Sequence, residues 1–367
     1  MNTLQRLYAE QNQSPWIDFI DRELVTSGRL RELIDEGIRG LTSNPTIFGK
    51  AVASGQYDEL IKHQIDAGAS NEQIYEEIAV TDVGDAADAL RSVYEESNGT
   101  DGFASIEVEP ALSADTQASV ERARHLWGRL NRPNVFIKIP ATEASIPAIT
   151  EAIAEGINVN VTLMFSVDVY RRVAEAYIEG LKQRREHGGD LSRLSSVASF
   201  FVSRVDTKVD KLLEKRDSDP ARELLGRAAI ANAKMAYQAY LELFHGSAFE
   251  ELRAAGAQVQ RCLWASTSTK NPDYRDVLYV EELIGPETVN TMPIETIDAF
   301  LDHGAVERTL DRNVDAARRE LRELGAEGVD LDRVTDELIE EGVAAFGKSF
   351  DDLIATIDGQ RKALATA

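Results

Sequence analysis

The stretch NVFIKIPAT, residues 134–142, has the pattern of a buried β-strand that carries a charge in its middle. Side chains of a strand alternate between its two faces, so Val135, Ile137 and Ile139 share one face and Lys138 points to the other. A lysine is rarely buried without a partner, and burial lowers its pKa because a low dielectric disfavours the ammonium form. A neutral lysine is a nucleophile. The stretch alone leaves two interpretations open: a buried, reactive Lys138, or a lysine on an exposed strand face.

Short apolar segments of strand length recur along the chain, separated by longer segments with helical periodicity. Strands are predicted at 16–20, 39–41, 103–108, 135–139, 157–163, 196–202, 259–265 and 288–292. Helices are predicted between them, among others at 116–130, 146–155, 167–184 and 221–244. Strands that alternate with helices are typical of parallel βαβ units, and a count of eight favours closure into a (β/α)8 TIM barrel. A doubly wound open sheet is the alternative.

The same alternation sorts the side chains of the other predicted strands. In residues 157–163, Val161 and Leu163 share the apolar face, whereas Asn160 and Thr162 share the polar one. In a barrel the apolar faces meet the outer helices and the other faces point inward. Polar residues near the strand ends then gather at the top of the barrel, where the active sites of such folds lie.

Seven polar side chains from six predicted strands converge on that end. They are Asp18, Asn44, Glu107, Lys138, Asn160, Thr162 and Ser199. Each has a structural explanation on its own, because an inward hydroxyl is usually hydrogen-bonded within a core and a carboxylate can cap a helix or pair with a cation. Together they would be costly to bury without a function, which favours a catalytic Lys138.

Six stretches resemble the transaldolase family. They are GLTSNPTIFGKA (40–51), SIEVEP (105–110), NVFIKIPAT (134–142), GINVNVTLMFS (156–166), SFFVSRVD (199–206) and WASTSTKNP (264–272). They occur in the family's order, and the likeness as a whole covers residues 14 to about 293. The likeness is greatest to the longer bacterial transaldolases, which have an extended helical C-terminal part.

The resemblance implies a (β/α)8 barrel that transfers a dihydroxyacetone unit through a lysine Schiff base. The family's donors are sedoheptulose 7-phosphate and fructose 6-phosphate, and its acceptors are glyceraldehyde 3-phosphate and erythrose 4-phosphate. The reaction belongs to the non-oxidative branch of the pentose phosphate pathway. The partners expected from the resemblance are therefore sugar phosphates.

Mapped by motif, the resemblance makes Lys138 the Schiff-base lysine and makes Asp18 and Glu107 the acid/base carboxylates. Thr162 then helps to hold a water molecule through which Glu107 works. The residues expected to bind substrate are Asn44, Asn160, Ser199, Phe201, Arg204, Ser266 and Lys270. Arg204 matches the family's phosphate-binding arginine. The spacing around Lys270 differs from the commoner arginine-bearing form, so a solvated surface lysine stays an alternative there.

The rest of the chain gives further expectations about its organisation and surroundings. We expect a single barrel domain over residues 1–367, with a helical C-terminal part from about 300 to 367 that packs on the barrel. Phe346 and Phe350 lie on a predicted helix with few other partners, which motivates the hypothesis that this part covers the site. The oligomeric state stays open between monomer and homodimer.

Composition excludes several classes of function. The 367 residues carry a net charge of −23, which argues against non-specific binding to nucleic acid or to an anionic membrane. The single cysteine, Cys262, fits a reducing compartment, and no apolar leader is visible, so we expect a cytoplasmic protein. The five histidines fall outside the predicted strand ends and form no H-x-x-x-H or Cys/His set, so no metal is expected. No dinucleotide or P-loop motif appears, and no cofactor is expected.

Two other functions are kept as alternatives. The first is a lyase like fructose 6-phosphate aldolase, which releases free dihydroxyacetone; relatives of that kind carry Gln and Tyr where this chain has Glu107 and Phe201. The second is a catalytically silent acidic barrel that serves as an interaction module. Such a protein would be expected to lose Lys138 or a carboxylate, and all are present.

Overall fold

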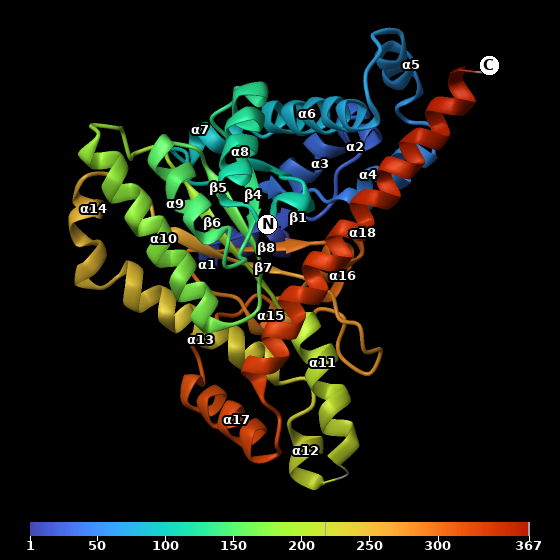
Figure 1. Ribbon diagram of the computed structural model, residues 1–367. Helices are drawn as coiled ribbons and strands as arrows, with labels where there is room; N and C mark the ends of the chain where they lie inside the picture. Colours follow the sequence, from blue (N-terminus) through green and yellow to red (C-terminus); the bar gives the residue numbers. More distant parts are fainter. Residues whose placement is uncertain (217, 366–367) are drawn as a thin grey trace.

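The computed structural model describes residues 1–216 and 218–365 and has eight parallel strands closed into a barrel (Figure 1). The strands are β1 (Gln13–Ile17), β2 (Gly40–Leu41), β3 (Phe103–Glu107), β4 (Val135–Pro140), β5 (Val159–Met164), β6 (Ser196–Phe201), β7 (Gln260–Ala265) and β8 (Thr288–Met292). Each strand pairs with the next in sequence, and β8 closes the barrel on β1. The predicted (β/α)8 TIM barrel is confirmed.

Helices connect the strands and surround the barrel. Up to β5 they are α1 (Thr3–Gln11), α2 (Arg22–Thr26), α3 (Arg29–Glu36), α4 (Pro45–Ala53), α5 (Asp58–Asp66), α6 (Asn71–Ala89), α7 (Arg91–Glu96), η1 (Pro110–Leu112), α8 (Thr116–Leu130) and α9 (Ile146–Glu155). After β5 they are α10 (Val167–Glu186), α11 (Ser203–Leu213), η2 (Glu214–Arg216), α12 (Asp219–Glu223), α13 (Ala228–Phe244), η3 (Ser247–Phe249), α14 (Glu250–Ala254), α15 (Leu278–Glu282), α16 (Ile294–His303), α17 (Val314–Ala326) and α18 (Leu331–Ala365). The bounds predicted for α8 and α9 are confirmed, and α10 is two residues longer than predicted.

Two predicted elements differ from the structure by more than two residues. The first strand is predicted at 16–20, whereas β1 runs from Gln13 to Ile17. The apolar pattern misses the start of the strand because Gln13 and Ser14 are polar, although both are buried and hydrogen-bonded. The helix predicted at 221–244 is broken between α12 and α13. The break contains Gly226, whose φ of +70° is accessible to glycine, and an added Cβ would lie 2.8 Å from the Tyr274 ring.

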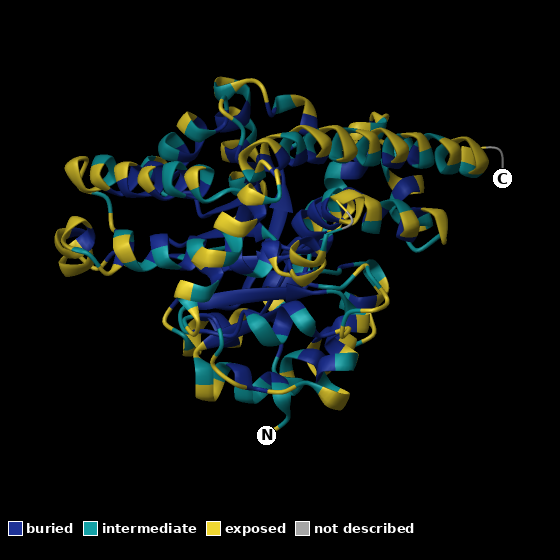
Figure 2. Ribbon diagram, turned by 90° about the horizontal axis from the view of Figure 1, so that it is seen from below, coloured by how far each residue is buried: buried dark blue, intermediate teal, exposed yellow. Residues whose placement is uncertain are grey.

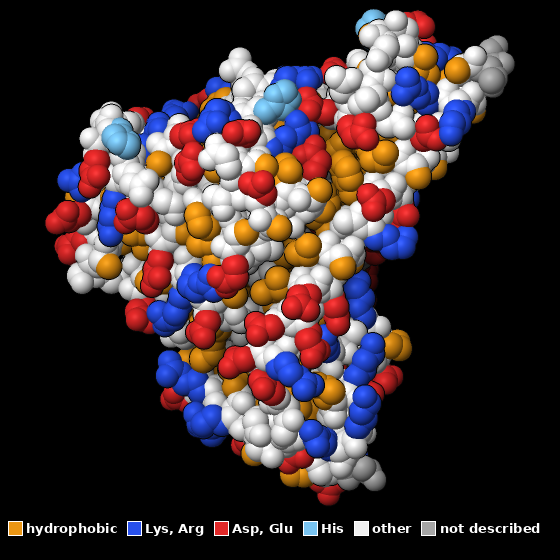
Figure 3. Space-filling view, viewed as in Figure 1, with side chains coloured by type: hydrophobic (Ala, Val, Ile, Leu, Met, Phe, Trp, Pro, Cys, Tyr) orange, Lys and Arg blue, Asp and Glu red, His pale blue; other side chains and the backbone are white. Residues whose placement is uncertain are grey.

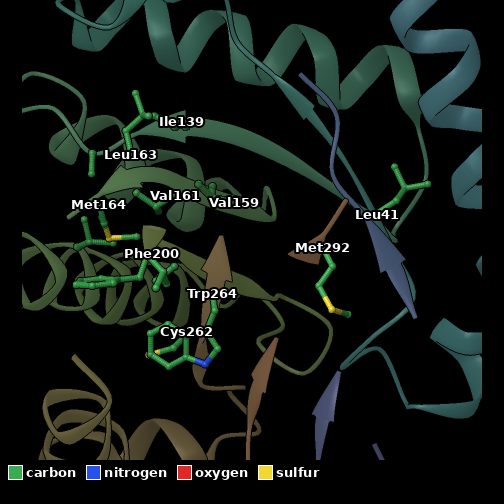
Figure 4. Packing of buried hydrophobic residues seen from close by; sticks show 14 of the residues in the cluster. Leu41, Ile139, Val159, Val161, Leu163, Met164, Phe200, Cys262, Trp264 and Met292 are labelled. Atoms are coloured by element: carbon green, nitrogen blue, oxygen red, sulfur yellow. The ribbon is translucent and has the colours of Figure 1, made fainter. Parts of the chain in front are cut away.

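The strands separate two apolar clusters, as the predicted alternation requires. Inside the barrel, the rings of Phe103 and Phe136 stack with centroids 4.2 Å apart, and Trp16 packs beside them. Glycine at position 40 makes room for Trp16, since a Cβ there would lie 2.4 Å from the indole. The larger cluster lies between the strands and the helices; Figure 4 shows some of its members, among them Trp264. Figure 2 shows the buried strands at the centre of the molecule.

The C-terminal helix α18 has 35 residues and packs on the barrel and its helices. It contacts α4, α5, α6 and α11, and it buries Val334, Leu338, Leu353 and Ile357. Its outer side is exposed along most of its length (Figure 2). These contacts support our proposal that residues 1–367 form one domain with a helical C-terminal part. No helix in the described part of the chain has the length and apolar character needed to cross a membrane.

Candidate active site

A pocket of about 410 Å³ opens at the C-terminal end of the barrel strands. Its lining residues are Asp18, Thr42, Asn44, Pro45, Thr46, Ile47, Glu107, Lys138, Thr162, Leu163, Ser199, Phe201, Arg204, Ala265, Ser266, Ser268, Lys270, Thr291, Pro293, Gly342, Ala345, Phe346 and Ser349. Ten of the eleven site residues predicted from the sequence are in this set. The pocket therefore brings together side chains that are separated by more than 250 positions in the chain.

Lys138 lies in β4 with only 8% of its surface exposed. Its Nζ donates hydrogen bonds to the carbonyl oxygen of Ser43 at 2.9 Å and to Oε2 of Glu107 at 3.1 Å. Glu107 is its direct neighbour on β3, since the two residues are paired in the sheet register. The lysine is thus buried with a partner, at the pocket wall, which answers the question that its place in the strand raised.

The environment of the Glu107 carboxyl group changes its acidity. Burial raises the pKa of the Glu107 carboxyl above its ordinary value, while Lys138 and a hydrogen bond from Thr162 act in the opposite direction. Thr162 Oγ1 lies 3.4 Å from Oε1 of Glu107. A carboxyl group with a raised pKa takes up a proton more readily than an ordinary carboxyl group, which favours a role as general acid/base.

Asp18 is held by Thr42, which in turn contacts Thr291, and the sequence analysis singled out neither threonine. It follows the last residue of β1, and Thr42 Oγ1 donates a hydrogen bond of 2.6 Å to its Oδ1. The Oγ1 of Thr291, on β8, lies 3.0 Å from that of Thr42. Strand alternation could have indicated both threonines, because residues two positions apart share a face. Thr42 lies two residues before Asn44, and Thr291 lies two residues after the inward Val289.

Asn44 caps α4. Its Oδ1 accepts a hydrogen bond from the backbone N–H of Ile47, and Pro45 occupies the first helical position. This arrangement satisfies an N–H group at the start of the helix and fixes the side chain at the pocket wall. Asn44 lines the pocket, and its Nδ2 has no hydrogen-bond acceptor among the described residues.

Asn160 is the predicted site residue that the structure does not bring to the pocket wall. It is fully buried, its Oδ1 accepts a 2.7 Å hydrogen bond from Ser199 Oγ, and its Nδ2 lies 3.4 Å from Ser105 Oγ. Ser199 itself lines the pocket. In this arrangement Asn160 orients the Ser199 hydroxyl from behind.

Cationic and hydroxyl groups gather at another part of the wall. Arg204, in the first turn of α11, lies over the Phe201 ring, with 5.2 Å between Cζ and the ring centroid. Burial lowers the pKa of Arg204, and Asp18 opposes that shift. None of the described acidic residues forms an ion pair with Arg204 in the structure. Lys270 donates to Ser268 Oγ at 2.8 Å. These groups can receive an anion such as phosphate.

Left-handed backbone conformations bring two further residues to the pocket wall. Ser266 has a φ of +57°, directly after β7, and its Oγ lies 2.9 Å from Ser203 Oγ. Leu163 has a φ of +59°, where the pairing of β5 with β6 shifts register. Leu163 packs in the same cluster outside the barrel as Val161, as predicted, and its left-handed conformation also brings it to the pocket wall.

Helix α18 completes the wall with Gly342, Ala345, Phe346 and Ser349. Gly342 packs against Leu163, and Thr46 donates a 3.2 Å hydrogen bond to Ser349 Oγ. The C-terminal helix therefore lies at the pocket, as the hypothesis from Phe346 required.

Comparison with known proteins identifies the family. The family model described as transaldolase/fructose-6-phosphate aldolase matches residues 15–357. The chain belongs to this family. A transaldolase of Mycolicibacterium paratuberculosis is 50% identical over 345 residues, which are 93% of this chain and 92% of that protein. A transaldolase of Thermobifida fusca is 48% identical over 97% of this chain and 98% of its own length.

The transaldolase resemblance predicted from the motifs is thus confirmed, and with it an enzyme of the transferase class. The similarity extends through the C-terminal part, since the family match ends at 357, within α18. The helix that lines the pocket is therefore part of what this chain shares with transaldolases. Among residues 1–216 and 218–365, no group of three or more His, Cys, Asp and Glu side chains is placed to hold a metal ion.

Proposed function

We propose that this chain is a transaldolase that carries a dihydroxyacetone unit as a Schiff base on Lys138. The donors are sedoheptulose 7-phosphate and fructose 6-phosphate, and the acceptors are glyceraldehyde 3-phosphate and erythrose 4-phosphate. The observation that carries the proposal is the position of Lys138 Nζ: buried at the pocket wall and 3.1 Å from a carboxylate oxygen of Glu107.

The first step needs a neutral amine. Proton transfer from Lys138 to Glu107 along their hydrogen bond gives an amine and a carboxylic acid, and the raised pKa of Glu107 favours that transfer. The amine attacks the C2 carbonyl of the ketose. Glu107 then returns the proton to the C2 oxygen, directly or through a water held with Thr162, and loss of water leaves a protonated imine.

The second step breaks the C3–C4 bond. The imine cation accepts the bonding electrons, and the Asp18 carboxylate takes the proton of the C4 hydroxyl as the aldose leaves. Thr42 holds that carboxylate through the 2.6 Å hydrogen bond. The remaining enamine must keep its orientation until the acceptor aldehyde arrives, for which Asn44 and Ser199 supply an amide and a hydroxyl.

The phosphate of donor and acceptor lies at the cationic wall in this proposal. Arg204 offers a planar guanidinium that can bind a phosphate through two parallel hydrogen bonds. Ser266 and Lys270 lie in the same wall and complete the phosphate site. Phe201 supports the guanidinium face. Asn160 acts through Ser199 rather than by direct contact.

Transfer is favoured over release of free dihydroxyacetone by the residue at position 107. A carboxyl group can move protons to and from the oxygen on C2, whereas the glutamine of aldolase-like relatives cannot. The relatives reported above bear the name transaldolase, which supports the same choice. A silent barrel would have no need for the buried pair of Lys138 and Glu107, whose desolvation is costly.

A product assay tests the choice. The protein is incubated with fructose 6-phosphate, with and without erythrose 4-phosphate, and sedoheptulose 7-phosphate and free dihydroxyacetone are quantified. We expect sedoheptulose 7-phosphate to form with the acceptor and little dihydroxyacetone without it. Stoichiometric release of dihydroxyacetone in the absence of acceptor would reverse the assignment in favour of the aldolase.

The cellular setting is part of the proposal. We infer a cytoplasmic enzyme that acts on sugar phosphates without a metal or cofactor and does not engage nucleic acid or membranes. The buried, free thiol of Cys262 and the net charge of −23 support this setting. The face in Figure 3 intersperses acidic and basic side chains. A monomer and a homodimer are both compatible with the proposal.

A further inference from the structure

A second cleft lies between helices α13, α15 and α17, which are neighbours in the fold (Figure 1). Its volume is about 460 Å³, within the range of small-molecule sites. It shares none of its described lining residues with the active-site pocket. The proposed transaldolase chemistry therefore gives this cleft no task.

A buried ammonium group faces this cleft. Lys234 lines it from α13, and only 7% of the Lys234 side chain is exposed. Its Nζ donates a single long hydrogen bond, 3.3 Å, to the carbonyl oxygen of Arg312. Its Nζ also forms a long ion pair with Glu282, whose Oε2 lies 3.7 Å away, beyond hydrogen-bond distance. An ammonium has three N–H donors, and a buried charge needs a close partner. Two of the three N–H donors of Lys234 thus have no hydrogen-bond acceptor among the described residues.

The start of α17 adds a second positive feature to the same cleft. Asn313 precedes the helix with a φ of +56° and makes no side-chain capping bond. The first backbone bond of the helix runs from the N–H of Ala317 to the carbonyl of Asn313, which leaves the N–H groups of residues 314–316 without an acceptor among the described residues. Asn313, Ala316 and Ala317 line the cleft. Unpaired N–H groups and the helix dipole attract anions.

The remaining charges of the cleft restrict what can bind. Arg227 and Glu320 pair with each other at 2.9 Å and so offset one another. Glu282 stays as a partly exposed negative group, which disfavours a ligand with several negative charges. Ile230 and Leu278 provide an apolar wall. The lining therefore suits a single oxyanion attached to a compact apolar body.

We propose that this cleft is a second binding site, for a small organic molecule that carries one phosphate or carboxylate group. The oxyanion accepts a close hydrogen bond from Lys234 Nζ in place of the long one to the Arg312 carbonyl. It also accepts hydrogen bonds from the backbone N–H groups at the start of α17. The apolar body lies along Ile230 and Leu278. This inference does not depend on the chemistry at Lys138.

The test uses phenyl phosphate and sodium benzoate as probes, with benzyl alcohol as the uncharged control. Binding is measured by ligand-detected NMR titration in the full-length Arg204→Gln protein, so that the cationic wall of the active site does not contribute. We expect saturable binding of at least one of the two anions and none of benzyl alcohol. The anion that binds more tightly identifies the phosphate or the carboxylate as the preferred group.

Two variants in the same background locate the binding. Lys234→Met keeps the length of the side chain and removes its charge, and should weaken binding by roughly 10- to 100-fold. Ala316→Glu places a carboxylate at the partly exposed start of α17 and should abolish binding without disturbing the core. Lys270→Met, at the active site, should leave anion binding at the second cleft unchanged.

Absence of anion binding in the folded Arg204→Gln protein would overturn the proposal. So would equal affinity of the Ala316→Glu variant and its parent. In an otherwise wild-type background, Lys234→Met and Ala316→Glu should retain full transaldolase turnover. Failure of the cleft is thereby distinguished from failure of the proposed function.

Discussion

The contacts of Lys138 account for a charged residue in the middle of a buried strand. Its Nζ lies between the Ser43 carbonyl and the Glu107 carboxylate, so the ammonium form is hydrogen-bonded and the neutral form is one proton transfer away. Both groups are almost completely buried. Neutralisation of the pair removes two charges from a low-dielectric site, which lowers the free energy of forming the nucleophilic amine.

Thr42 is a positioning residue for Asp18 in this account. Thr42→Val removes the 2.6 Å hydrogen bond to the carboxylate, so the carboxylate loses its orientation toward the C4 hydroxyl. We expect kcat to fall roughly tenfold, in line with ~1.5 kcal/mol for such a bond, with KM little changed. Thr42→Ser should restore most of the loss because it keeps the hydroxyl. Steady-state kinetics of both variants check this prediction. An equal loss of kcat in Thr42→Ser and Thr42→Val would contradict it.

At the scale of the element, α18 forms part of the pocket wall although it is distant in sequence from the barrel strands. It is anchored on both sides of the pocket. Lys208 on α11 pairs with Glu337 at 2.8 Å, and Thr46 on α4 bonds Ser349. Helices α11 and α4 also carry Arg204 and the cap Asn44. The C-terminal helix is thereby tied to the two elements that bear binding residues.

Phe346 tests whether α18 shields the enamine from water. Phe346→Ala should open the pocket wall, raise the release of free dihydroxyacetone relative to transfer, and leave the unfolding midpoint nearly unchanged, since Phe346 is only half-buried. Phe350→Ala is the matched control, because Phe350 packs on Tyr75 with ring centroids 5.2 Å apart. The ratio of the two products checks the prediction. Equal ratios for both variants would rule out a shielding role for Phe346.

Asp206 links α11 to its neighbours and makes stability depend on pH. Burial raises the pKa of Asp206 to about 7, although the N–H of Ala229 and the hydroxyl of Tyr279 donate to it. The folded state therefore binds this proton more tightly than the unfolded state. The stability that Asp206 contributes is present below pH ~4 and is lost as the pH rises toward ~7.

Asp206→Asn removes this titration. We expect the free energy of unfolding of the variant, relative to that of the native protein, to rise by on the order of 3 kcal/mol between pH 4 and pH 7. Urea unfolding at several pH values measures the difference. A difference that stays constant over this interval would mean that Asp206 does not titrate there.

At the scale of the whole molecule, the two ends of the barrel have different tasks. The C-terminal end holds the pocket, and the opposite end is closed by a buried charge cluster around Asp101, which is 1% exposed. The Asp101 carboxylate accepts from Trp16 Nε1 at 2.9 Å and from Arg39 Nε at 2.8 Å, and Arg261 lies at 3.5 Å. This arrangement suits stability rather than catalysis.

Asp101→Asn should separate the two tasks. It leaves Arg39 and Arg261 without their carboxylate, and the loss of a buried partner costs roughly 3–5 kcal/mol. We expect a lower unfolding midpoint in urea and unchanged kcat in the folded protein. A tenfold loss of kcat without loss of stability would show that the bottom of the barrel acts on the chemistry.

Alternation and motif order were enough to predict the barrel and most of the pocket wall. They did not predict the features that depend on three-dimensional contacts. The polar start of β1 is buried through partners distant in sequence, such as Ser14 with Asp101. Leu163 and Ser266 reach the pocket wall because their backbone is left-handed, and the alternation of side chains along a strand does not predict such residues. Thr291 becomes relevant only through Thr42, from another strand.

The central claim is that Lys138 carries the substrate, and borohydride trapping tests it most directly. The protein and Lys138→Ala are incubated with fructose 6-phosphate, reduced, digested and mapped by peptide mass spectrometry. The account predicts an adduct with the mass of dihydroxyacetone on the Lys138 peptide and none in the variant. Folded, native protein that carries no adduct on any lysine, or one on a lysine other than Lys138, would contradict it.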